Sequence, residues 1–168
     1  GGILQSVRDV HARSEAELEA LTRTRLRTLI ANGATTIEVK SGYGLVLEAE
    51  VKQLRVIQRL APELPATHVP TFQGAHEVPP EYRSKRGEYV RLVCEEMIPV
   101  VARERLARCC DVFCEPGVFS AAESRQILTA AARHGLAVKL HADELDGSGG
   151  AELAGELGAL SPGHLPAI

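Results

Sequence analysis

The densest group of chemically useful side chains in this sequence is His141, Asp143 and Glu144. The group follows the short, mostly apolar run 137–140, which is typical of a buried strand. In parallel α/β proteins, ligands and metals bind at the carboxyl ends of the strands. An imidazole there can bind a metal ion, and a carboxylate three residues later can carry a proton. The spacing therefore offers a metal ligand in His141 and a general acid and base in Glu144.

Each of these side chains also has a purely structural interpretation. His141 could be a histidine that is hydrogen-bonded at a strand end, and Glu144 could be a solvated acid that caps a helix. The neighbouring acids and the position favour a functional role for His141, while both interpretations of Glu144 stay open. We expect Asp143 only to orient the loop.

Three further side chains follow predicted strands, namely Tyr43, His76 and His164. Because the ends of parallel strands converge on one face, His76 and His141 can point into one pocket, although a loop-capping role for His76 stays equally open. Tyr43 lies between two glycines, which let the backbone bend and bring the phenol inward. The structural alternative is that its ring only covers the apolar core. No function is expected for the other histidines.

Helical and extended patterns alternate along the chain and predict the elements that position these residues. Ser-x-x-Glu capping boxes begin helices at Ser14 and Ser120. Further helices are expected over residues 47–57, 89–106 (interrupted before Pro99) and 151–157. Strands are expected at residues 35–39, 66–72, 111–114, 137–140 and 159–161. About five strands with helical crossovers give either part of a barrel or an open sheet, since a complete (β/α)₈ barrel needs about 250 residues.

The composition is that of an ordinary globular protein: 45% of the 168 residues are hydrophobic, 24% are charged, and the formal net charge is −3. No basic stripe with interleaved aromatics supports nucleic-acid binding, and no apolar run approaches the length of a membrane span. The four cysteines form no CxxC pair, and we expect them to be reduced thiols packed in a cytosolic core.

Four segments carry a further signal, in this order: residues 40–45 (KSGYGL), 71–82 (TFQGAHEVPPEY), 111–115 (DVFCE) and 138–144 (VKLHADE). Their order and spacing resemble those of the imidazolonepropionases, a family of the amidohydrolase superfamily. The resemblance extends over nearly the whole chain. It implies a partial TIM-type (β/α) barrel of the metal-dependent amidohydrolase kind, with residues 1–168 as part of the catalytic barrel and the first and last barrel strands absent.

The resemblance also implies roles for individual residues. His141 would bind one metal ion, either Zn²⁺ or Fe²⁺/Fe³⁺. Glu144 would move a proton and contact the substrate, and Tyr43 and His76 would contact the substrate as well. His164 could supply a proton or polarise a carbonyl, although the family usually has an acid where this chain has a glycine before that histidine.

The family's His-x-His pair, its late aspartate and its substrate-binding arginine have no counterpart in this chain. We therefore expect a piece of a longer protein that is inactive alone. For the full-length protein, the resemblance implies hydrolysis of 4-imidazolone-5-propanoate to N-formimidoyl-L-glutamate in histidine degradation. Two alternatives stay open: an amidohydrolase that acts on another cyclic amide or deaminates a ring, and a non-catalytic α/β fragment or assembly module. We expect a cytoplasmic protein with a small-molecule substrate and no nucleic-acid or membrane partner, and leave a homodimer open.

Overall fold

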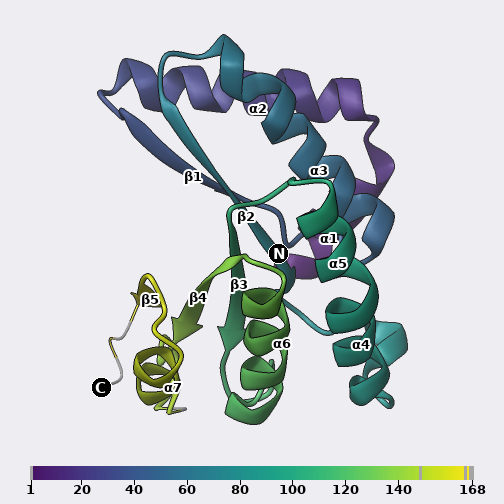
Figure 1. Cartoon of the computed structure of the whole chain (residues 1–168). Coiled ribbons are helices and arrows are strands. Elements are labelled where there is room, and N and C mark those ends of the chain that lie inside the picture. Colours follow the sequence, from purple (N-terminus) through teal and green to yellow (C-terminus); the bar gives the residue numbers. More distant parts are fainter. Residues whose placement is uncertain (1, 148, 165, 167–168) are drawn as a thin grey trace.

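Five parallel strands form one sheet, and their order in the sheet is their order in the sequence. This arrangement comes from a computed structural model, described for residues 2–147, 149–164 and 166. The strands are β1 (Thr36–Lys40), β2 (Thr67–Ala75), β3 (Cys109–Cys114), β4 (Ala137–Ala142) and β5 (Pro162–His164). An order without reversal is that of a (β/α) barrel, whereas open doubly wound sheets reverse at a switch point. The expected partial barrel is thus confirmed, and the strands fan out as an arc (Figure 1).

Helices connect the strands and lie along one side of the arc (Figure 1). Before β1 come α1 (Ile3–Ala12) and α2 (Glu15–Ala31), and between β1 and β2 come α3 (Leu47–Leu60) and the 3₁₀ turn η1 (Ala61–Glu63). Between β2 and β3 come η2 (Pro80–Tyr82), α4 (Arg86–Leu92), the π-helical turn η3 (Val93–Met97) and α5 (Ile98–Arg103). The last two are α6 (Ala121–Arg133) and α7 (Gly150–Glu156). Each crossover therefore returns the chain to the same end of the sheet.

Both predicted capping boxes are confirmed. The Ser14 hydroxyl accepts the backbone N–H of Glu17, and the Glu17 carboxylate accepts the backbone N–H of Ser14 at 2.8 Å. Ser120 and Glu123 make the same reciprocal pair at the start of α6. Two backbone donors that a helix start leaves unpaired are satisfied in each case, which explains why these helices begin where the sequence indicates.

The sequence did not predict the helix α1, and it misplaced the last strand. The interruption of the α-helix predicted before Pro99 is present as the π-helical turn η3, after which α5 begins with Pro99 in its first turn, where the missing N–H is tolerated. The last strand is Pro162–His164 rather than residues 159–161. Pairing with β4 begins where Leu160 N–H bonds to Val138 O, and only the next residues continue as a regular ladder. His164 therefore lies within the last strand instead of beyond it.

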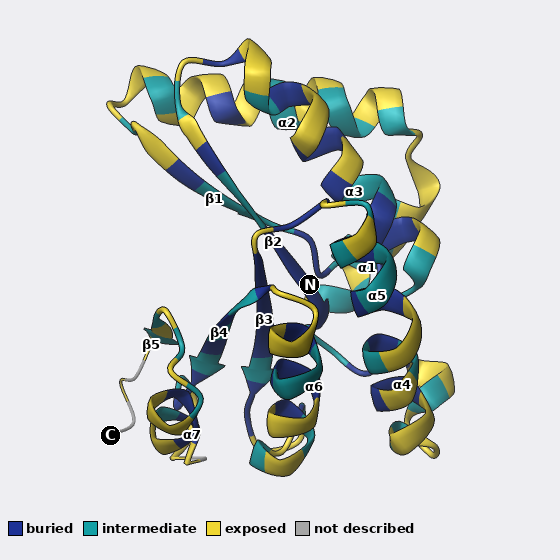
Figure 2. Cartoon of the chain, viewed as in Figure 1, coloured by how far each residue is buried: buried dark blue, intermediate teal, exposed yellow. Residues whose placement is uncertain are grey.

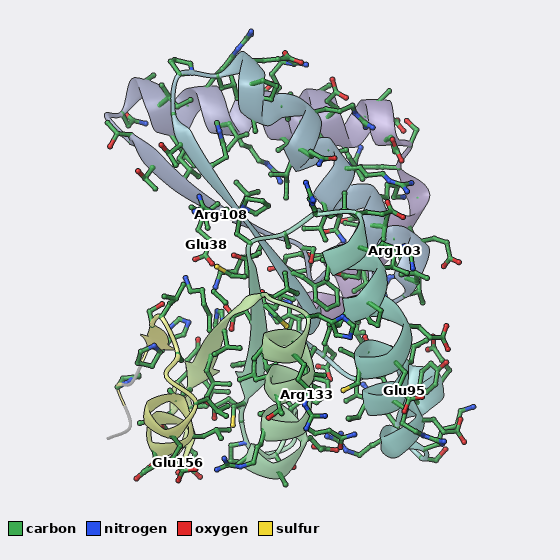
Figure 3. The ribbon with its side chains drawn as sticks, viewed as in Figure 1. Glu38, Glu95, Arg103, Arg108, Arg133 and Glu156 are labelled. Carbon is green, nitrogen blue, oxygen red and sulfur yellow. The ribbon has the colours of Figure 1, made fainter. Side chains whose placement is uncertain are left out.

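The two faces of the sheet differ in character. Toward the helices, the strands bury apolar side chains, and burial follows the strands and the inward sides of the helices (Figure 2). These core side chains include Phe72, Cys110, Val112, Val138 and Leu140. The other face carries polar side chains, and Figure 3 shows Glu38 on this side, away from the helices. In a closed (β/α) barrel the helices form the outer ring, so the face away from the helices is the interior.

Two composition-based expectations can be compared with the structure. Cys109, Cys110 and Cys114 are buried and Cys94 is half-buried, which agrees with thiols packed in the core. Burial raises the pKa of Cys94 to about 11. Over the described residues, no helix has both the length and the apolar character that a membrane span requires.

Candidate active site

The carboxyl edge of the sheet brings together the five residues that the sequence singled out. Tyr43 follows β1, His76 follows β2, His141 and Glu144 lie at and after the end of β4, and His164 ends β5. The rings of Tyr43 and His76 lie 5.0 Å apart, edge to face, and those of His141 and His164 lie 5.2 Å apart. Glu144 Oε2 lies 3.4 Å from His164 Nε2. One face of the fold therefore carries all five side chains, as expected for strand ends.

Phe113 connects the two ring pairs. Its ring centroid lies 6.0 Å from that of His76 and 5.9 Å from that of His141, in both cases at a steep angle. A continuous row of rings thus runs along the sheet edge from the β1 side to the β5 side. Edge-to-face contacts of this kind fix ring orientations against one another.

His141 is held by a buried carboxylate. Its Nδ1 lies 3.0 Å from Asp111 Oδ1, and Lys40 Nζ lies 2.5 Å from Asp111 Oδ2. The Asp111 side chain is only 1% exposed. Burial by itself would raise the pKa of Asp111, but the hydrogen bond and charge of His141 and the charge of Lys40 outweigh it and lower that pKa. These contacts use only Nδ1, so Nε2 remains the nitrogen that can bind a metal ion or a substrate.

A second polar cluster lies on the same face, one pleat closer to the start of the strands. The Glu38 carboxylate accepts hydrogen bonds from Lys139 Nζ and Thr71 Oγ1, both at 2.7 Å, and lies 3.7 Å from Lys40 Nζ. Burial raises the pKa of Glu38, yet the hydrogen bonds and the lysine charges more than offset this and lower it overall. This cluster of charged side chains therefore lies next to the site residues, on the side toward the start of the strands.

The loop between β1 and α3 is held by a buried glutamate. The Glu50 carboxylate accepts the backbone N–H groups of Gly42, Gly44 and Leu45 at 2.9, 2.7 and 2.9 Å. Leu45 has a φ of +57°, an uncommon conformation for leucine. A Cβ added at Gly44 would lie 2.5 Å from a backbone nitrogen of α3, so this position requires glycine. The loop that carries Tyr43 is therefore fixed by hydrogen bonds from its backbone to the side chain of Glu50.

His76 is anchored to the same loop. Its Nδ1 lies 2.9 Å from the carbonyl oxygen of Gly42, which can only accept, so Nδ1 carries the hydrogen. Burial lowers the pKa of His76, and the hydrogen bond to Gly42 only partly offsets this. A neutral imidazole with Nδ1 engaged can still contact a ligand through Nε2. The loop-capping contact and the substrate-binding interpretation are therefore compatible.

The two acids after β4 have different partners. Asp143 Oδ2 accepts the backbone N–H of Ala151 at 2.8 Å, in the first turn of α7, so Asp143 orients the loop as predicted. The N-cap of this helix is Gly149, and the acid that accepts a backbone N–H in its first turn is Asp143 rather than Glu144. The Glu144 backbone N–H bonds to the buried carboxylate of Glu115, while the Glu144 side chain faces His164.

Several residues that position the site were missed by the sequence-based reasoning. They are Lys40, Gln73, Asp111, Glu50 and Glu115. A signal exists for the first three, since Lys40 and Gln73 come directly after predicted strands and Asp111 begins one, so that the strand alternation places them on the polar face. Among the residues that the structure describes, no three histidine, cysteine or acidic side chains are grouped closely enough to hold a metal ion.

The chain is similar to known proteins over nearly its whole length, although no family model matches it. The imidazolonepropionase of Symbiobacterium thermophilum is 61% identical over 166 residues, which covers 98% of this chain and 39% of the relative. The imidazolonepropionases of Porphyromonas gingivalis and Clostridium tetani are 49% and 52% identical over 165 residues, with the same coverage of both chains. The chain thus spans about two fifths of the length of the relatives it matches. In sequence, this chain is similar to a part of the imidazolonepropionases, over about two fifths of their length.

Proposed function

We propose that the full-length protein hydrolyses 4-imidazolone-5-propanoate to N-formimidoyl-L-glutamate, the ring-opening reaction of histidine degradation. The observation that carries this proposal is the 61% identity to an imidazolonepropionase over 98% of the chain. The gathering of Tyr43, His76, His141, Glu144 and His164 at one sheet edge supports it, because that edge is where such barrels bind their substrates. No observation favours a different cyclic amide or a non-catalytic module.

We infer that residues 1–168 are part of a catalytic barrel that the rest of the polypeptide completes. Within the described residues, the edge strands β1 and β5 each pair on one side only. A groove of about 520 Å³ lies between β1 and the helices α1 to α3. Leu21 and Leu29 line this groove and are 37% and 46% exposed. A further strand beside β1 would bury these apolar side chains.

We propose His141 as a ligand of one metal ion, Zn²⁺ or an iron ion. The fit is supported by its surroundings, since metal-binding histidines usually donate their other ring N–H to a carboxylate, and Asp111 stands in that position. A structural or catalytic zinc site needs three or four protein ligands, so the remaining ligands would come from the rest of the polypeptide. When bound, such an ion lowers the pKa of water and polarises a carbonyl.

The residues of this chain would do the following. The Glu144 carboxylate accepts a proton from the attacking water and passes it to the ring nitrogen as the C–N bond breaks. His164, 3.4 Å from Glu144, orients that carboxylate and polarises the ring carbonyl. Tyr43 and His76 hydrogen-bond to the ring. We further propose a cytoplasmic location and, for the assembly, a homodimer.

The test is turnover by the purified full-length protein. Metal-dependent conversion of the imidazolone to N-formimidoyl-L-glutamate, identified by mass spectrometry, is expected, and His141→Ala should lose both metal and activity. Hydrolysis of other cyclic amides without turnover of the imidazolone would replace the proposed substrate. A folded, metal-loaded protein with no hydrolase activity would support a non-catalytic role instead.

A further inference from the structure

Two polar groups lie near His141 Nδ1, and they require different protonation states of that nitrogen. Asp111 Oδ1, at 3.0 Å, belongs to a carboxylate that can only accept, so this contact requires a hydrogen on Nδ1. Gln73 Nε2, at 3.4 Å, is an amide nitrogen that can only donate, so this contact requires Nδ1 to be bare. A neutral imidazole carries one ring hydrogen and cannot satisfy both.

The Asp111 contact decides the tautomer. It is the shorter of the two, and hydrogen bonds to a charged carboxylate are about twice as strong as neutral ones. Asp111 is almost fully buried, so Oδ1 without a donor would be a buried, unpaired acceptor. The Gln73 amide can rotate by half a turn and offer its oxygen at the same place. Only the Nδ1–H form of His141 is therefore compatible with both neighbours.

Lys40 fixes which oxygen of Asp111 faces His141. Its ammonium group lies 2.5 Å from Oδ2, on the side opposite to the histidine contact at Oδ1. Lys40, Asp111 and His141 come from three strands, β1, β3 and β4, whose side chains meet on the polar face of the sheet. The carboxylate thus has one oxygen for each partner, and its orientation does not depend on solvent.

We propose that Asp111 is a positioning residue that holds His141 in its Nδ1–H tautomer and thereby presents an unprotonated Nε2 to the metal ion. The inference rests on the proposed function in one respect, which is the role of His141 as a metal ligand. A carboxylate in this position orients the ring and makes the other nitrogen a better donor to the metal, and its loss typically weakens metal binding by about 10–100-fold.

The experiment measures the tautomer and the metal affinity separately. Full-length, metal-free protein labelled with ¹⁵N-histidine would be studied by long-range ¹H–¹⁵N correlation at about pH 8, where an ordinary histidine is neutral. The His141 signals, identified by their loss in His141→Gln, should show the Nδ1–H pattern. In Asp111→Asn, whose amide can donate to Nδ1, the Nε2–H form should appear, and zinc affinity measured against a chelator should fall by about 10–100-fold.

The matched control is Glu38→Gln. Glu38 is an acid of the same polar face that bonds to Lys139 and Thr71 and, like Asp111, lies near Lys40, at 3.7 Å, but it does not bond to His141. This variant should keep both the Nδ1–H pattern and the zinc affinity. A general disturbance of the charged face would instead weaken zinc binding equally in both variants, and that result would overturn the specific role of Asp111.

Two further results would overturn the inference. One is an Nε2–H pattern for His141 in the wild-type protein, a measurement that needs no variant to fold. The other is Asp111→Asn with the wild-type tautomer and zinc affinity. Either could occur in an enzyme that still binds metal and opens the ring, so the proposed function would stand. Conversely, a correct tautomer with His141 signals that do not respond to zinc would overturn the metal-facing role of His141 itself.

Discussion

At the scale of single residues, Asp143 and Glu144 are adjacent acids with separate partners. Asp143 accepts a backbone N–H at the start of α7, and the Glu144 carboxylate faces His164. The first contact stabilises a loop and the second lies among the ring side chains of the candidate site. Substitutions at the two positions should therefore affect different properties.

In the full-length protein, Glu144→Gln should lower kcat by about 10²–10⁴-fold while metal content stays complete, because glutamine keeps the size but cannot accept a proton. Steady-state kinetics and metal analysis on the same sample check this. Asp143→Asn, which can still cap the helix, serves as the control and should keep most of its activity. Normal turnover by Glu144→Gln at full metal occupancy would show that another group moves the proton.

His76 should make stability depend on pH. Burial lowers its pKa in the folded protein from the usual 6.5, so the unfolded chain takes up the proton first as the pH falls. Its effect is absent well above pH 6.5, and stability is lost as the pH falls from about 6.5 toward the lower folded pKa. Urea unfolding at about pH 7.5 and 5.5 should show this loss, reduced in His76→Gln. Equal losses in both proteins would contradict a desolvated His76.

At the scale of elements, two buried glutamates hold the loops that carry site residues. Glu50 binds three amide groups of the loop around Tyr43, and Glu115 binds those of Glu144 and Leu145. In each case a carboxylate supplies acceptors that the loop backbone lacks. Loop geometry thus depends on buried carboxylates as well as on the loop backbone.

Glu50→Ala should reduce the free energy of unfolding by at least about 1–3 kcal/mol, since three backbone donors lose their acceptor inside the protein. Glu50→Gln should recover part of this, because its carbonyl oxygen still accepts. The control is Glu48→Ala in the same first turn of α3, where the exposed side chain should contribute within about 0.5 kcal/mol. Denaturant unfolding of the three variants checks the order, and equal effects at both positions would contradict the anchoring role.

At the scale of the whole molecule, the 168-residue chain by itself should neither bind zinc stoichiometrically nor open the imidazolone ring. No group of three suitable ligands occurs among its described residues, and a zinc site normally takes three or four. Equilibrium dialysis and a hydrolysis assay on the isolated chain test this. Ring opening that scales with bound metal would mean that the chain forms a complete site.

Local sequence was enough for most elements and for selecting the side chains that lie at the carboxyl edge of the sheet. The capping boxes at Ser14 and Ser120 act within four residues, so they can be recognised without knowing the rest of the fold. The strand before His141 was expected from its apolar run, and the class followed from the alternation of patterns. Local sequence misplaced β5, because its bounds depend on pairing with β4 rather than on its own propensity.

What the sequence by itself determined is therefore which side chains stand at strand ends, since this follows from local caps and periodicity. Only the tertiary structure decided which of them meet. Lys40 and Asp111 are 71 residues apart, and Asp111 and His141 are 30 apart, so their contacts depend on strand order and register. A period of two assigns a side chain to a face, but the neighbouring strand and its register determine its partner. For that reason His141 could be predicted from its own segment, while the carboxylate that orients it could not.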